Sequence, residues 1–239
     1  MKTLGLIGGM SWESTVPYYR LINETVKEKL GGFHSARLLL YSVDFAEIEA
    51  LQQAGDWETA GRLLGEAGAA LARGGAEGLA LCTNTMHKVA PQVESLSGLP
   101  LLHIADAAAA AIQQTGLQRV GLLGTRFTME QDFYVARLRQ QGLEVLIPPP
   151  AERQEVHRVI FEELVLGKVL EASRRRYQEI IAGLLQAGAQ GVILGCTEIG
   201  LLIGSQDAPA PLFDTTSIHA HYAAEWMLES PSHPTAGQR

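Results

Sequence analysis

Short apolar runs that end at glycine alternate along the chain with longer stretches in which apolar and polar residues are mixed. Four such runs are LGLIGG (4–9), GLALCTNT (78–85), VGLLGT (120–125) and GVILGCTE (191–198). Consecutive apolar positions are typical of strands buried on both faces, and ARLLLYSVDF (36–45) belongs to the same class. The mixed stretches have the length and spacing of helices at 57–75, 86–96 and 173–191. The alternation predicts βαβ units that build a parallel sheet.

The two halves of the chain repeat this plan. The run at 120–125 resembles the run at 4–9 at an offset of 116 residues, and GAQGVILGCTE (188–198) resembles GAEGLALCTNT (75–85) at an offset of 113. Two similar offsets, carried by different elements, favour a duplication. We therefore predict an α/β fold with two pseudo-symmetric domains, each a mostly parallel sheet flanked by helices. The expected boundaries are 1–100 plus 215–229 for the first domain, 101–214 for the second and 230–239 for a flexible tail.

The composition is typical of a soluble globular protein. Of the 239 residues, 46% are apolar and 19% are charged, and the net charge of −7 argues against non-specific binding to nucleic acid. No apolar run approaches the roughly 18 residues of a membrane span, and MKTLGLIGGMSW at the start lacks the apolar core of a signal peptide. We expect Cys82 and Cys196 to be free thiols, and no His or Cys spacing matches a metal site. The sequence predicts a cytoplasmic protein without metal or cofactor.

Polar and glycine residues follow the apolar runs at the positions where a ligand would bind. They form the segments GGMSWES (8–14), TNT (83–85), GTRFT (124–128) and CTE (196–198). In open parallel sheets ligands bind beyond the carboxyl ends of the strands, where hydroxyl groups and helix N-termini suit a carboxylate or phosphate. Each segment alone is also explained as a tight turn or a helix cap. Together they predict a site for a small anion, whereas the lack of GxGxxG and GxxxxGK[ST] argues against a nucleotide.

The aligned repeats place Thr83 in one half where Cys196 stands in the other. Two related halves that face across a cleft would present these side chains to opposite sides of one substrate. Such a geometry suits an enzyme that removes a proton from one face of a carbon and returns a proton to the other. A thiol pKa of about 8.5 can be lowered at a helix N-terminus, whereas a threonine hydroxyl has no such acidity. We therefore expect two unequal catalytic positions.

The motifs GLIGGMSWEST, TNTMH, FEELVLGK and GCTEIG make the sequence similar to the aspartate/glutamate racemase family over about 4–228. The resemblance implies a cofactor-independent enzyme, commonly a homodimer, with its active site in the cleft between two pseudo-symmetric domains. Family members use two cysteines as paired acid and base. Here Cys196 keeps its role, Thr83 stands at the first cysteine position, and Cys82 comes one residue too early and is expected in the core.

The Thr83/Cys196 pair resembles a subgroup that acts on aspartate and glutamate. It implies that Cys196 abstracts the α-proton of the L-enantiomers, with reprotonation from the Thr83 side. Gln52 is expected beside the substrate side chain, and Lys168 is expected to pair with the distal carboxylate or else to close a helix as a solvated lysine. Further contacts to the α-carboxylate and amino group are implied for Met10, Ser11, Asn84, Thr85 and Thr197. Glutamate racemases of cell-wall synthesis more often carry His where this chain has Glu198, which favours the aspartate-type branch.

Two other functions stay open at this stage. A single thiol would also suit a decarboxylase or a maleate-type isomerase of the same superfamily, although Lys168 favours a dicarboxylate over an aryl substrate. A non-catalytic protein that binds acidic amino acids is the other alternative, and the intact GCTE motif argues against it.

Overall fold

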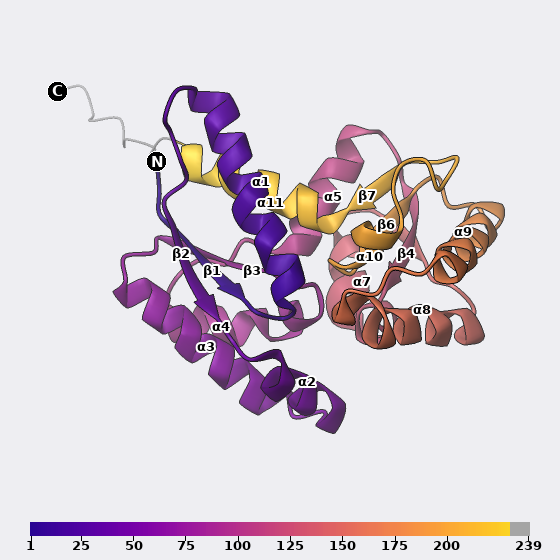
Figure 1. The fold of residues 1–239 in the computed structure, drawn as a ribbon, viewed down its shortest axis with the longest axis horizontal. Helices are drawn as coiled ribbons and strands as arrows, with labels where there is room; N and C mark the ends of the chain where they lie inside the picture. Colours follow the sequence, from indigo (N-terminus) through magenta and orange to yellow (C-terminus); the bar gives the residue numbers. More distant parts are fainter. Residues whose placement is uncertain (230–239) are drawn as a thin grey trace.

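The computed structural model describes residues 1–229, and its first parallel sheet comes from the first third of the chain (Figure 1). Strand β1 (Leu4–Gly8) lies in the middle of this sheet. It pairs on one side with β2 (Leu38–Ser42) and on the other with β3 (Gly78–Leu81). All three strands run parallel, as the alternating pattern predicted.

The second sheet repeats this arrangement with one more strand. Strand β4 (Arg119–Gly124) pairs with β5 (Glu144–Leu146) and with β6 (Val192–Gly195), and β7 (Leu212–Asp214) follows β6 at the edge. The helices that precede β4 are α1 (Trp12–Leu30), α2 (Phe45–Ala54), α3 (Trp57–Arg73), the 3₁₀ turn η1 (Thr85–Val89), α4 (Ala90–Ser97) and α5 (Ile104–Gln114). Those that follow are α6 (Arg126–Glu130), α7 (Asp132–Gln140), α8 (Pro150–Glu162), the 3₁₀ turn η2 (Leu164–Leu166), α9 (Glu171–Gln186), α10 (Ile199–Leu202) and α11 (Thr215–Leu228).

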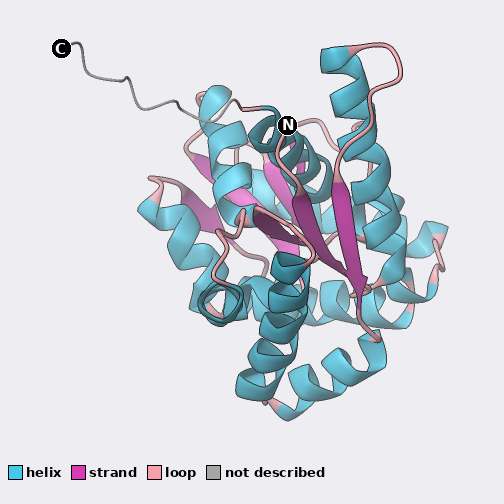
Figure 2. Cartoon of the chain, turned by 90° about the vertical axis from the view of Figure 1, so that its left-hand side faces the viewer, coloured by secondary structure: helices cyan, strands magenta, loops and turns pink. Residues whose placement is uncertain are grey.

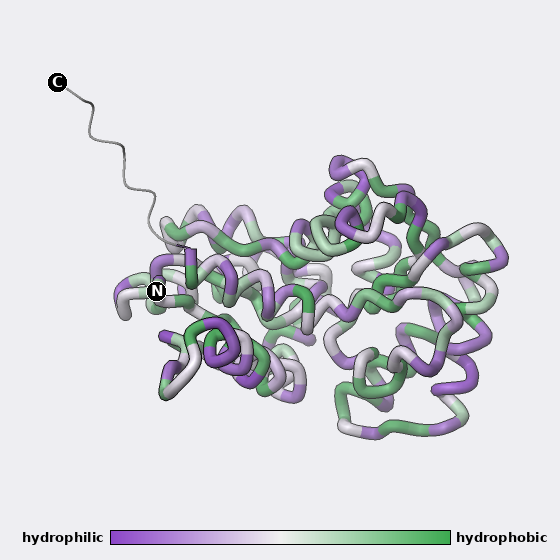
Figure 3. The backbone as a smooth tube through the Cα atoms, turned by 90° about the horizontal axis from the view of Figure 1, so that it is seen from above, coloured by the Kyte–Doolittle hydropathy of each residue, from purple (hydrophilic) through white to green (hydrophobic). Residues whose placement is uncertain are grey.

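Helices cover both faces of the first sheet (Figure 2). Alternate residues of β1 point to opposite faces, so Leu6 packs in one core cluster with α1 and α11, while Ile7 packs in another with α3 and α4. The second sheet shares a single large cluster with its flanking helices. Hydrophilic and hydrophobic residues alternate along the helices (Figure 3). This alternation is typical of helices that pack an apolar face against the core.

The helices that close the two sheets are exchanged between the halves. Helix α5 follows the first sheet but packs against α7 of the second half, and α11 follows β7 of the second sheet but packs along α1 of the first (Figure 1). The two exchanged helices also pack against each other. Each half therefore depends on the other for part of its covering layer.

The strand order confirms the predicted two-domain α/β fold. Strand β3 lies beside β1 as β6 lies beside β4, which are the pairs that the repeats relate. The duplication extends further. In the first half Leu101 forms a single parallel bridge to Leu79 of β3, and this bridge corresponds to the pairing of β7 with β6 in the second half. The segments that follow β1 and β3 form hydrogen bonds to those that follow β6 and β4, so these four strand ends meet between the halves.

Three details differ from the sequence-based picture or lie outside it. Strand β2 is at the edge of its sheet, so Leu40 and Tyr41 are exposed rather than buried on both faces. The stretch at 86–96 is divided between η1 and α4. The predicted tail at 230–239 lies outside the described residues. Within 1–229, none of the helices has both the length and the apolar character that crossing a bilayer requires.

Candidate active site

The loop after β1 holds Ser11 in a fixed position at the end of the first sheet. Gly9 has φ of +91°, and a side chain there would bring its Cβ to 2.8 Å from the backbone nitrogen of Val43, so the tight turn requires glycine. The Thr15 hydroxyl accepts a hydrogen bond from the Gly9 N–H (2.9 Å) and donates one to the carbonyl of Ser11 (3.0 Å). Ser11 itself is 3% exposed.

The TNT segment after β3 is tied to the second half of the chain by side-chain hydrogen bonds. Asn84 Nδ2 donates to Thr215 Oγ1 (3.0 Å), and Thr215 Oγ1 donates to the carbonyl of Leu194 (2.7 Å) on β6. The hydroxyl oxygens of Thr85 and Thr125 lie 3.0 Å apart. The strand ends of the two sheets are therefore joined at two points. Thr83, the proposed catalytic threonine, is buried within this segment.

His87 fixes the backbone around Thr83. Its Nε2 accepts a hydrogen bond from the Ile104 N–H (3.2 Å), so its Nδ1 carries the proton and donates to the carbonyl of Thr83 (2.8 Å). Burial lowers the pKa of His87 well below its usual value, with smaller contributions from His103 and His219. The ring is neutral at pH 7 and acts here as a structural hydrogen-bond bridge.

The carboxylate of Glu198 is the polar centre of the site. It accepts hydrogen bonds from three side chains: Ser11 Oγ (2.7 Å), Cys196 Sγ (3.0 Å) and Thr197 Oγ1 (2.8 Å). Glu198 is 3% exposed, and one donor comes from the first half while two come from the second. Glu198 was predicted only as part of the strand-end segment CTE (196–198) and not as a site residue of its own. An acidic residue two positions after a candidate nucleophile, at a buried strand end, was the signal that could have identified it.

The thiol of Cys196 is not acidified in this structure. Burial raises its pKa well above the usual value, and the charge of Glu198 and the hydrogen bond to it raise the pKa further. The lowering of the thiol pKa that a helix N-terminus could provide is therefore outweighed by burial and by Glu198. The helix that follows, α10, has only four residues, and the lowering by backbone hydrogen bonds is smaller than the effect of burial. Cys196 is therefore a protonated thiol that donates a hydrogen bond to the carboxylate of Glu198.

One buried acceptor at the site has no hydrogen-bond partner among the described residues. Asn84 Oδ1 is fully shielded while Nδ2 of the same amide is bonded to Thr215. A buried acceptor left unpaired is costly, because it has lost its water without gaining a donor. A ligand that brings an N–H group to this point would remove that cost.

The other predicted residues divide into two groups. Met10 and Gln52 are buried next to the site, and Gln52 Nε2 donates to Met86 Sδ (3.0 Å), a weak acceptor. Lys168 is exposed and follows η2, and it does not line the cavities near the strand ends.

Cys82 is fully buried in the core cluster beneath α1 and α11, as expected, and both cysteines are free thiols. Among residues 1–229, no group of His, Cys, Asp or Glu is placed to hold a metal ion.

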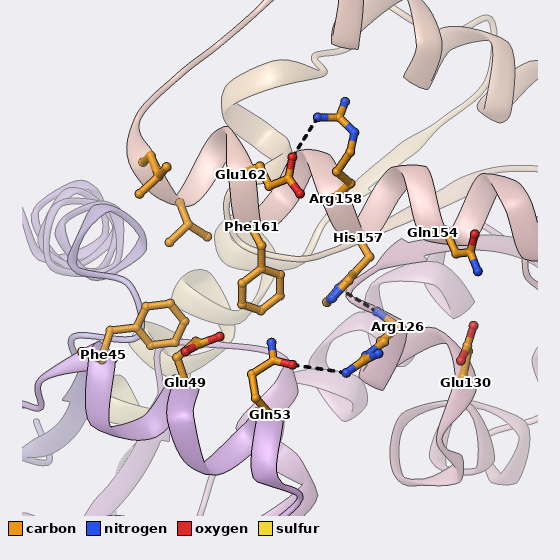
Figure 4. A pocket seen from close by; sticks show the side chains of 13 residues that line it. Phe45, Glu49, Gln53, Arg126, Glu130, Gln154, His157, Arg158, Phe161 and Glu162 are labelled. Atoms are coloured by element: carbon orange, nitrogen blue, oxygen red, sulfur yellow. Dashed lines mark hydrogen bonds and ion pairs between the residues drawn. The ribbon is translucent and has the colours of Figure 1, made fainter.

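Two cavities lie between the halves. The smaller, of about 450 Å³, is lined by Gly9, Ser11 and Trp12 among others. The larger, of about 720 Å³, separates α2 from α8 (Figure 4). They share the wall residues Phe45, Val165 and Leu166 and are therefore neighbours, but Thr83, Cys196 and Glu198 line neither of them.

Comparison with known proteins gives one family and several solved structures. The sequence model of the family described as Asp/Glu/Hydantoin racemase matches residues 7–223. A Yersinia pestis protein solved as a candidate Asp/Glu racemase is 58% identical, with a TM-score of 0.90 over 96% of this chain and 100% of that one. An aspartate racemase homologue from Pyrococcus horikoshii OT3 is 38% identical, with a TM-score of 0.83 over the same shares. The aspartate racemase of Picrophilus torridus, 20% identical, shares the fold (TM-score 0.73, 94% of this chain and 95% of that one).

Proposed function

Because the chain belongs to the Asp/Glu/hydantoin racemase family, we propose that it interconverts the enantiomers of aspartate and glutamate and prefers the L-enantiomers as substrates. Membership in the family supports a racemase, and the substrates and the direction are our inference. The observation that carries the proposal is the 3.0 Å hydrogen bond from the Cys196 thiol to the Glu198 carboxylate, in a pocket where both side chains are buried.

In the first step Glu198 accepts the proton of the Cys196 thiol. The resulting thiolate removes the α-proton of the L-amino acid, and the electron pair of the C–H bond is delocalised into the α-carboxylate. Proton transfer over one hydrogen bond needs no rearrangement, since donor and acceptor are already at 3.0 Å. Because the pKa of the Cys196 thiol is raised, the thiolate that forms from it is a correspondingly stronger base.

In the second step the carbanion receives a proton on its opposite face from the Thr83 side, by relay from water. The amino group of the substrate donates to Asn84 Oδ1, the acceptor that lacks a partner among residues 1–229. To bind the α-carboxylate, the hydroxyl hydrogens of Ser11 and Thr197 turn towards it from Glu198, and that of Thr85 turns from Thr125. Solvent then removes the proton from Glu198 and restores the proton relayed through Thr83.

The unequal pair explains faster α-proton exchange from the L-substrates, which Cys196 can deprotonate and reprotonate on the same face without forming D-product. Reaction from the D-enantiomer would require a base on the Thr83 side, and a threonine hydroxyl is too weak an acid to be present as an alkoxide near pH 7. The loss of a matched general base typically costs about 10²–10⁴-fold in rate. We therefore expect α-proton exchange from D-substrates to be slower than from L-substrates by a factor in this range.

The test is α-proton exchange in D₂O, followed by NMR with chiral analysis of the products. L-Aspartate, D-aspartate, L-glutamate and D-glutamate are each incubated with the wild type, with Cys196→Ala and with Cys82→Ala. The wild type and Cys82→Ala should exchange the L-substrates and form D-product, whereas Cys196→Ala should not. Absence of exchange from all four amino acids, or full activity in Cys196→Ala, would overturn the proposal.

A further inference from the structure

We propose that His87 is a positioning residue that holds Thr83 in place for the protonation of the carbanion, so that it governs how fast the D-product forms but not how fast Cys196 removes the α-proton; this inference rests on the racemase function proposed above. In the protonation step the O–H bond of Thr83 breaks, the new C–H bond forms on the second face of the carbon, and water returns a proton to the hydroxyl. Three observations support the role of His87: the way Thr83 is held, the fixed orientation of the ring, and the difference between the two repeats.

Thr83 is held in place through its backbone carbonyl. Strand β3 ends at Leu81 and η1 begins at Thr85, so Thr83 lies in neither element. Within residues 1–229 its carbonyl accepts a hydrogen bond from His87 Nδ1 at 2.8 Å, and its hydroxyl forms no hydrogen bond to another residue. The hydroxyl is therefore left for the substrate or water, and His87 sets the direction of the peptide that carries it.

The ring of His87 connects Thr83 to α5, one of the two helices that the halves exchange. Its Nε2 accepts from the N–H of Ile104, the first residue of α5, at 3.2 Å. The ring is 2% exposed and lies against the rings of His103 and His219, at 4.5 and 5.7 Å between centroids. A buried ring that is bonded at both nitrogens and packed against two others cannot turn without losing a hydrogen bond. The position of α5 is thereby passed on to the Thr83 carbonyl.

The repeats assign this support to one side of the site alone. The offset of 113 that aligns Thr83 with Cys196 also aligns His87 with Gly200, which has no side chain. On the Cys196 side the reacting group itself is oriented, because the thiol donates to Glu198 at 3.0 Å. Disturbing His87 should therefore impair proton transfer on the second face and spare proton removal on the first.

Two amide side chains separate the bond to Thr83 from the bond to Ile104. The amide nitrogen of a shorter asparagine can take the place of Nδ1, so His87→Asn keeps a donor for the Thr83 carbonyl. The amide of a longer glutamine lies near the place of Nε2, so His87→Gln keeps an acceptor for the Ile104 N–H and leaves the Thr83 carbonyl without its donor. The two variants are otherwise closely matched in polarity.

The experiment follows L-aspartate in D₂O and compares two rates: loss of the α-proton, measured by NMR, and formation of D-aspartate, measured by chiral analysis. The proteins are the wild type, His87→Asn, His87→Gln and the matched control His219→Gln. The control changes a buried histidine of the same cluster whose hydrogen bonds go to Tyr18 and to the carbonyl of Leu102 instead of Thr83.

His87→Gln should lower the rate of D-aspartate formation by about 10- to 100-fold, the fall expected when a reacting group is displaced by about 1 Å, and should change the rate of α-proton loss by less than about threefold. Proton loss continues because Cys196 can return a solvent deuteron on the same face. His87→Asn and His219→Gln should keep the wild-type ratio of the two rates.

A wild-type ratio in His87→Gln, or an equal fall of the ratio in His219→Gln, would overturn the inference while the racemase function stands. An equal fall of both rates in His87→Gln would also overturn it, since a purely structural role predicts that result. Thermal unfolding of each variant checks the fold. A lowered ratio in His87→Asn contradicts the inference as well, so the test stays valid if the glutamine variant folds poorly. A wild type without α-proton loss from any of the four amino acids would remove the racemase function and the inference together.

Discussion

Thr83 and Cys196 stand at equivalent positions of two related strand ends, and the difference in acidity between a hydroxyl and a thiol is the main chemical asymmetry of the proposed site. The environments differ as well. Cys196 donates to Glu198, whereas the structure gives Thr83 a backbone contact to His87. Replacing Thr83 by cysteine, which gives both positions a thiol, tests this asymmetry directly.

Thr83→Cys should raise the rate of α-proton exchange from D-aspartate and D-glutamate by about 10²-fold, because a thiol can supply the base that a hydroxyl cannot. Exchange from the L-enantiomers should change little. Thr83→Ser is the matched control, since it keeps a hydroxyl and should keep the preference for L-substrates. An unchanged D-rate in Thr83→Cys, measured in D₂O by NMR, would show that reprotonation does not come from position 83.

Glu198→Gln removes the proton acceptor and keeps the size of the side chain. The charge of Glu198 and its hydrogen bond help raise the pKa of Cys196, so removing the charge should lower that pKa even though kcat falls by about 10²–10⁴-fold. The thiol of the variant should react with iodoacetamide at lower pH than the wild-type thiol. A purely structural role for Glu198 predicts loss of activity without this shift of the alkylation profile, and Cys82→Ala in both backgrounds assigns the signal to Cys196.

At the scale of elements, glycines allow α3 and α4 to approach closely. A side chain at Gly65 of α3 would bring its Cβ to 2.9 Å from Cβ of Leu96 on α4, a distance that a change of rotamer cannot relieve. Gly183 of α9 has no neighbour within 4 Å of the corresponding position. Gly65 of α3 is therefore required by close packing, whereas Gly183 of α9 is not.

Gly65→Ala should destabilise the protein by about 1–2 kcal/mol, because overpacking exceeds the gain in helix propensity. Gly183→Ala should stabilise it by about 0.5–1 kcal/mol, since only the propensity changes. Urea unfolding of both variants beside the wild type measures the two free energies. Changes of the same sign in both would contradict the assignment of close packing to Gly65.

The sequence predicted β1, β2, β3, β4 and β6, their parallel arrangement and the strand-end segments, because buried strands and tight turns are encoded locally by apolar runs and glycine, whereas the short strands β5 and β7 are not among the runs from which the strands were predicted. It did not reveal that β2 is exposed at a sheet edge, since LLLY has the same pattern in an edge strand as in a central one. The hydrogen bond from Ser11 to Glu198 depends on tertiary packing of segments 187 residues apart, whereas Cys196 and Thr197 directly precede Glu198 in the sequence. The larger cavity likewise joins α2 to α8, which lie far apart in the sequence, and only the end of α8 falls within a motif, FEELVLGK (161–168).

At the scale of the whole molecule, three buried histidines lie where the exchanged helices meet the first half. The His87 and His103 rings are 4.5 Å apart and those of His87 and His219 5.7 Å apart, and His219 bonds to Tyr18 of α1 (2.8 Å) and to the carbonyl of Leu102 (2.7 Å). Burial lowers the pKa of His103 to about 3 and that of His219 to about 4, and lowers that of His87 well below its usual value. All three are neutral in the folded protein at pH 7, and they are packed between both halves.

The free energy of unfolding should therefore fall as the pH drops from about 6.5 towards 4. In this window the unfolded chain binds protons on these histidines and the folded chain does not, so acid favours the unfolded state by about 1.4 kcal/mol per pH unit for each group. Asp214 acts in the opposite direction, because burial raises its pKa, but it is one group against four, since burial also lowers the pKa of His157. His103→Asn tests the cause, since asparagine can still accept the capping hydrogen bond from the Ala105 N–H and cannot titrate. Urea unfolding from pH 7 to 4 should give a slope of the unfolding free energy against pH that is smaller by about one proton in this variant than in the wild type. Equal slopes in the two proteins would show that His103 does not contribute to the acid sensitivity.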